Sequence, residues 1–81
     1  MRIKVMLFAN AAELVGASTM ALDLPGEASV LDALDALEVA YPAIGPLRSG
    51  LAVAVNHVYS NLATPLSDGD EVALIPPVSG G

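Results

Sequence analysis

The fold of this chain follows from residues 29–41, SVLDALDALEVAY, which stand near the middle of the sequence. The apolar residues of this stretch recur at steps of four, three and four, which predicts an amphipathic helix with one buried stripe made of Val30, Leu34, Leu37 and Tyr41. Ser29 followed by Asp32 is a helix-start pattern, and Pro42 ends the helix. Leu31 is expected to widen the stripe. No other segment predicts a helix of this length.

Short strand-like segments lie on both sides of the helix. They are rich in alternating apolar side chains, and they comprise residues 3–8, 19–24, 51–55, 58–59 and 71–75. Between the first two, Asn10 with Glu13 predicts the capped start of a short helix that ends at Gly16. Residues 43–50 contain two glycines and a proline and are expected to form a loop.

Two strands, one long helix and two or more further strands indicate an α+β domain of the β-grasp, or ubiquitin-like, type. We expect a mixed sheet whose first and last strands run parallel at its centre, with the main helix packed on one face. The covered face then takes Ile3, Val5, Leu7, Val72 and Leu74. The other face keeps a contiguous apolar surface formed by Met6, Phe8, Tyr59, Ala73 and Ile75.

The chain ends in a segment that contributes nothing to a core. Pro76-Pro77 stops the last strand, because proline fixes φ and lacks an N–H, so residues 1–77 form the domain and residues 78–81 an extended, flexible tail. Gly80 and Gly81 have no Cβ, so the backbone fits a channel too narrow for other residues. Val78, Ser79 and Gly80 are expected to thread such a channel and to present the carboxylate of Gly81 to chemistry inside it.

Composition excludes several classes of function. With 81 residues the chain forms one domain, and it has no cysteine, which excludes disulfides, thiolate metal sites and a cysteine nucleophile. No apolar run reaches the ~18 residues of a membrane span and no signal peptide is recognisable, which indicates a cytoplasmic protein without a membrane partner. The net charge of −6 argues against nucleic acid. It favours partners with basic surfaces, with solubility as an equal explanation.

Few side chains suggest catalysis. Asp32, Asp35 and Glu38 share the polar face of the main helix at steps of three, so they form an acidic ridge that is either solvated or, less simply, a carboxylate pair or metal site. His57 is the only histidine, and with no Ser or Cys near it in sequence it is expected in a turn. We therefore expect neither a metal nor a cofactor bound by the domain itself.

Four parts of the sequence together resemble the small, sulfur-carrying subunit of molybdopterin synthase. They are residues 5–9 with 13–16, Ala54-Val55-Asn56, residues 65–72 (PLSDGDEV), and the ending Pro76-Pro77-Val78-Ser79-Gly80-Gly81, which is the most specific. The resemblance covers the whole chain. Many members of that family carry an arginine just before Glu-Leu in the first helix, whereas Ala11 and Ala12 stand there in this chain, which puts one polar partner contact in doubt.

The resemblance implies a sulfur carrier for molybdenum cofactor biosynthesis. An ATP-dependent activating enzyme would adenylate Gly81, and sulfur would replace AMP to give a thiocarboxylate. The large subunit of molybdopterin synthase would then use the tail to convert cyclic pyranopterin monophosphate, with the carrier inert alone. Phe8, Tyr59 and Ile75 are the expected apolar centre of the partner interface. Three alternatives are a thiamin-pathway sulfur carrier, a ubiquitin-like protein modifier, and a non-catalytic interaction module.

Overall fold

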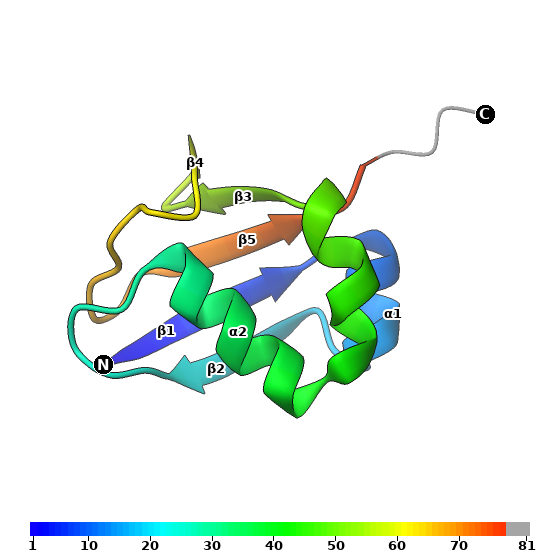
Figure 1. Cartoon of the computed structure of the whole chain (residues 1–81), viewed down its shortest axis with the longest axis horizontal. Helices are drawn as coiled ribbons and strands as arrows, with labels where there is room; N and C mark the ends of the chain where they lie inside the picture. The colour runs from blue at the N-terminus through cyan, green and yellow to red at the C-terminus, as the bar shows by residue number, and fades with distance from the viewer. Residues whose placement is uncertain (78–81) are drawn as a thin grey trace.

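A computed structural model describes residues 1–77 as a five-stranded mixed sheet covered on one face by helices (Figure 1). The strands are β1 (Arg2–Leu7), β2 (Thr19–Asp23), β3 (Ala52–Val55), β4 (Val58–Ser60) and β5 (Glu71–Ile75). The helices are α1 (Ala9–Val15), α2 (Val30–Ala40) and the 3₁₀ helix η1 (Pro42–Gly50). Among these residues no helix has the length and apolar character needed to cross a membrane.

The strand order β2-β1-β5-β3-β4 confirms the predicted β-grasp arrangement. β1 and β5 pair in parallel at the centre, with Val5 opposite Val72 and Leu7 opposite Leu74. β1 also pairs antiparallel with β2, and β5 pairs antiparallel with β3. The chain therefore leaves β5 at the end of the sheet where β1 also ends (Figure 1).

The core lies between α2 and one face of the sheet. All five residues predicted for the covered face are no more than 2% exposed, namely Ile3, Val5, Leu7, Val72 and Leu74. From α2 the buried residues are Val30, Ala33, Leu34 and Leu37. The prediction for Leu31 was wrong, because its side chain is 41% exposed and Ala33 packs inward instead. Tyr41 packs against the core while remaining half-buried.

The start of α2 is capped as predicted. The Asp32 carboxylate accepts hydrogen bonds from the Ser29 backbone N–H at 2.8 Å and from the Ser29 hydroxyl at 3.1 Å. For α1 the predicted cap was wrong, because the helix begins at Ala9 with Phe8 as N-cap and no capping side chain. Gly16 ends α1 with a φ of +83°, the left-handed conformation expected of a helix-ending glycine.

The segment predicted as a loop after α2 is instead η1, which has Pro46 inside it. Proline and glycine weaken an α-helix, but a 3₁₀ turn forms in short pieces and tolerates them when tertiary contacts hold it. Ile44 supplies such a contact, since it is fully buried in the core. The main helix does end before Pro42, as predicted, but the segment that follows is a 3₁₀ helix and not a loop.

Candidate functional site

The three residues predicted for the partner interface lie together on the uncovered face of the sheet. Phe8, Tyr59 and Ile75 line one shallow pocket of ≈ 240 Å³. The Phe8 side chain is 43% exposed and that of Tyr59 is 75% exposed, so both are available to a partner. The remaining lining residues are Met6, Ala54, His57, Glu71 and Ala73. We call these eight residues the open-face patch.

Strand register explains why the patch forms. Met6 is opposite Ala73, Ala73 is opposite Ala54, and Ala54 is opposite Tyr59, so one row crosses β1, β5, β3 and β4. Directly paired residues point to the same face of a sheet. Because the two middle positions are alanines, the row is hollow at its centre. The larger side chains of Met6 and Tyr59 stand at its two ends.

Three members of the patch carry no interface signal in the sequence. Ala54 is a buried alanine in a strand, and only the register places it on the pocket floor. His57 is in a turn, as predicted, and it follows Asn56; the φ angles of these residues are +69° and +49°. Asn56 ties this turn to β5, because its side-chain oxygen accepts a hydrogen bond from the Glu71 backbone N–H at 2.9 Å. His57 and Glu71 therefore give the patch a polar rim.

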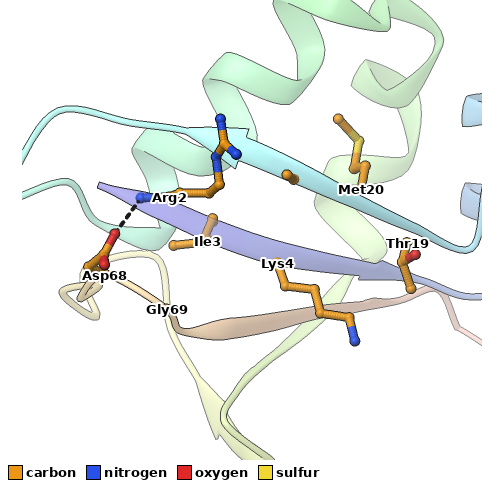
Figure 2. Close-up of a pocket in the computed structure, with 8 residues that line it drawn as sticks. Arg2, Ile3, Lys4, Thr19, Met20, Asp68 and Gly69 are labelled. Atoms are coloured by element: carbon orange, nitrogen blue, oxygen red, sulfur yellow. Dashed lines mark hydrogen bonds between the residues drawn. The ribbon is translucent and has the colours of Figure 1, made fainter.

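A second groove, of ≈ 480 Å³, lies beside β1 and β2 (Figure 2). Figure 2 shows Lys4 and Thr19 pointing to the same side from neighbouring strands, and the Arg2 backbone N–H donating to Asp68 Oδ1 at 2.7 Å. Arg2 also pairs with Asp23 across the two strands, with Nε 2.8 Å from Oδ1. The hydrogen bond from Arg2 lowers the pKa of the Asp23 carboxyl from its usual range. This groove is lined by several charged side chains, whereas the open-face patch is mostly apolar.

The tail begins next to Ile75, which is one of the residues of the open-face patch. Ile75 is the last residue of β5, Pro76 is buried, and Pro77 is exposed. The predicted reactive residue Gly81 and the predicted threading residues Val78, Ser79 and Gly80 lie outside the described residues. The described part thus supplies the anchor of the tail and the surface beside it.

The acidic ridge of α2 is not simply solvated. Arg48 of η1 donates from Nη1 to Asp35 at 2.8 Å and to Glu38 at 3.0 Å. These hydrogen bonds raise the pKa of the Arg48 guanidinium above its usual value. Asp32 is occupied by the helix cap. Within residues 1–77 no cluster of acidic or histidine side chains is arranged to hold a metal ion, so the ridge joins α2 to η1.

Known proteins share both the sequence and this arrangement. The chain is 38% identical to the molybdopterin synthase sulfur carrier subunit of Arabidopsis thaliana, over 98% of this chain and 82% of that protein. It is 43% identical to small archaeal modifier protein 1 of Haloferax volcanii, over 93% of this chain and 95% of that protein. A crystal structure of this Haloferax protein, SAMP1, covers both chains fully with a TM-score of 0.91 at 38% identity.

A further solved structure shows a related chain together with a partner. It is the protein–protein complex of subunits 1 and 2 of the molybdopterin-converting factor of Helicobacter pylori, which matches with a TM-score of 0.70 and 27% identity over the whole of both chains. Residues 5–81 match the ThiS family, which leaves only the first four residues of the chain outside the match. The chain therefore belongs to the ThiS family of ubiquitin-like sulfur carriers.

Proposed function

We propose that this protein is the sulfur carrier of molybdopterin synthase, with Gly81 as the residue that carries sulfur. One observation supports this more than any other: the open-face patch runs along β5 as far as Ile75, the last residue of that strand, so it reaches the end of the sheet where the tail leaves at Pro76 and Pro77. A partner that covers the patch is therefore next to the start of the tail. A large-subunit partner is supported by the Helicobacter pylori complex of two subunits.

The proposed chemistry requires no side chain of the carrier. An oxygen of the Gly81 carboxylate attacks the α-phosphorus of ATP on the activating enzyme, which releases pyrophosphate and forms an acyl adenylate. Hydrogen sulfide delivered by a sulfur donor then attacks the acyl carbon and loses its protons to solvent, and AMP leaves with the bonding electron pair. The product is a thiocarboxylate, whose sulfur passes to cyclic pyranopterin monophosphate on the large subunit. Adenylation is needed because a free carboxylate is a poor electrophile.

The most direct experiment is intact-mass spectrometry of the protein isolated from its own host. We expect a species heavier than the unmodified chain by the difference between one sulfur and one oxygen atom, and its loss after deletion of Gly81. In vitro, the activating enzyme and ATP should release pyrophosphate with the full chain and not with the chain ending at Gly80. Pyrophosphate release that persists without Gly81 would contradict the proposal.

Gly80 offers a milder change at the same place. Gly80→Ala adds one methyl group and restricts φ, so sulfur transfer should fall sharply if the tail enters a narrow channel. The melting temperature should stay at the wild-type value, because the substitution lies beyond the last strand. Sulfur transfer at the normal rate would remove the argument for a narrow channel.

A second candidate is a protein modifier, which the identity to small archaeal modifier protein 1 favours. Such a protein would use the same activated Gly81 to acylate a lysine amine of a target, with AMP or sulfide as the leaving group. The two functions differ in their products. Two observations together would favour the modifier. The chain would be found joined to other host proteins by isopeptide bonds, and the host would make molybdopterin without the thiocarboxylate form of the chain.

A further inference from the structure

We propose that Gly50 is a positioning residue for the reactive tail: because it has no side chain, it leaves room beside η1 for Pro77, a place that we call the seat, and so sets where the tail starts. This inference rests on the proposed function, because it concerns the delivery of Gly81 to an activating enzyme. The residues involved come from the end of η1 and from the segment after β5, which lie side by side in Figure 1. They are 27 positions apart in the chain, so only the fold brings them together.

Pro77 lies so close to Gly50 that any side chain at position 50 would touch the proline ring. A Cβ placed on Gly50 would lie 3.4 Å from Cγ and 3.5 Å from Cδ of Pro77, which is ordinary van der Waals distance. An alanine would therefore just contact the proline ring. A branched side chain adds atoms beyond the Cβ, and these have to displace Pro77 or be displaced by it.

Space, not backbone conformation, is what a glycine provides at this position. Gly16 and Gly69 have φ angles of +83° and +84°, where other residues are strained. Gly50 has no such φ, so its backbone accepts an L-residue. What a larger residue would disturb is the proline ring that follows β5.

The seat is rigid because η1 is held at three places. Ile44 anchors it in the core, where it is fully buried. Arg48, two residues before Gly50, is joined to α2 through Asp35 and Glu38. After Gly50, the Leu51 backbone N–H donates to the Arg48 carbonyl at 3.3 Å, and β3 begins. Because these contacts hold η1 on both sides of Gly50 and Pro77 is exposed, we expect a clash at Gly50 to move Pro77.

Glu38 shows how closely η1 approaches α2. A Cβ on Gly45 would lie 3.1 Å from Glu38 Oε2, closer than ordinary contact. An alanine at position 45 would therefore require the Glu38 carboxylate, which pairs with Arg48, to shift slightly. Two residues of the acidic ridge, Asp35 and Glu38, thus help to hold η1, the helix that ends at Gly50, against α2.

The seat matters because the tail has to place one carbonyl carbon against a nucleotide. Misplacing reacting groups by about 1 Å can cost on the order of 10²-fold in rate. Docking of the body depends on the open-face patch, which Gly50 does not line. A displaced tail root should therefore lower kcat for adenylation while leaving the KM for the carrier nearly unchanged.

The test compares Gly50→Val with Gly26→Val in the full chain. Gly26 is the matched control, because it also lacks a left-handed φ, and among residues 1–77 no atom beyond its chain neighbours lies within 4 Å of the place that a Cβ would take. Pyrophosphate release by the activating enzyme gives kcat and the KM for each carrier variant. We expect Gly50→Val to lower kcat by about ten- to hundredfold with KM within about twofold, and Gly26→Val to match wild type.

Pro77→Ala removes the other side of the contact and keeps the test usable if Gly50→Val does not fold, since Pro77 is exposed and follows β5. The double variant completes a cycle: if the two residues act through one contact, its kcat should be no lower than that of the worse single variant. Fully additive losses, or a change confined to KM, would overturn the inference.

A nuclear Overhauser effect between Gly50 and Pro77 protons supplies a measurement that does not depend on activity. We expect it in wild type and in Gly26→Val, and we expect it to be lost in Pro77→Ala. If wild type shows this effect but is not adenylated, the proposed function fails and the positioning role of Gly50 fails with it. If wild type is adenylated and Gly50→Val reacts at the same kcat, the seat fails and the proposed function stands.

Discussion

The two faces of the sheet are built from the same strands and differ in what covers them. Leu74 points under α2 and is 2% exposed, whereas its neighbour Ile75 lines the open-face patch and remains half-buried. Likewise Leu7 is 2% exposed and the next residue, Phe8, is 43% exposed. Adjacent residues in a strand point to opposite faces, so equally apolar side chains acquire opposite roles.

This difference shows that apolar character alone does not identify a core residue. The helix and not the strand decides which apolar row stabilises the fold, because α2 removes one face from water. On the other face the apolar side chains surround a hollow floored by Ala54 and Ala73. That shape suits insertion of a partner side chain more than closure by the chain itself.

The largest effect is expected from the covered face. Leu74→Ala should lower the free energy of unfolding by roughly 2–5 kcal/mol, because it leaves a cavity among fully buried neighbours. Ile75→Ala is the matched control and should cost clearly less. Urea denaturation followed by circular dichroism measures both. Equal losses would mean that the two faces contribute equally to the free energy of unfolding.

The next effect is on binding. Phe8→Ala should weaken the complex with the large synthase subunit by more than ~1 kcal/mol and leave the melting temperature almost unchanged. Leu14→Ala is the matched control, since Leu14 is 44% exposed against 43% for Phe8 but lies on α1 and not in the patch. Isothermal titration calorimetry gives both affinities. A large stability loss with unchanged affinity would place Phe8 in the core.

A smaller effect concerns α2, the helix that covers one of the two faces. Asp32→Ala removes the acceptor for both Ser29 hydrogen bonds at the start of α2, and caps of this kind contribute about 1 kcal/mol. Partner affinity should not change, because Asp32 does not line the patch. Thermal unfolding and calorimetry together check this. Weaker binding at unchanged stability would connect the capped end of α2 to the partner instead.

The smallest effect is expected from the ion pair between Arg2 of β1 and Asp23 of β2. The hydrogen bond from Arg2 lowers the pKa of Asp23, so folding gains stability above the unfolded-state pKa and loses it as pH falls through the lower folded-state pKa. Asp23→Asn should remove this acid-side loss. Because the pair is fully exposed, the change should be slight and weaker still at high salt. Melting temperatures across acidic pH at two salt concentrations test the expectation.

Much of the fold was predictable because it depends on local patterns. Alternation in the strands identified the covered face, and Ser29 with Asp32 located the start of α2. The grouping of Phe8, Tyr59 and Ile75 was also predicted, since strand parity follows once the fold is known. By contrast, Ala54 joined the patch through cross-strand register, for which a single strand carries no signal.

By itself the sequence determined the strand and helix periods, the stop at Pro76-Pro77 and the residues available for chemistry. These follow from side-chain spacing and from the backbone limits of proline and glycine. Tertiary structure alone decided that residues 42–50 form η1, that Arg48 forms ion pairs with Asp35 and Glu38, and that Pro77 lies beside Gly50. The physical reason is that these contacts join residues 10 to 27 positions apart, whose proximity depends on the packing of α2 and β5 and not on local preference.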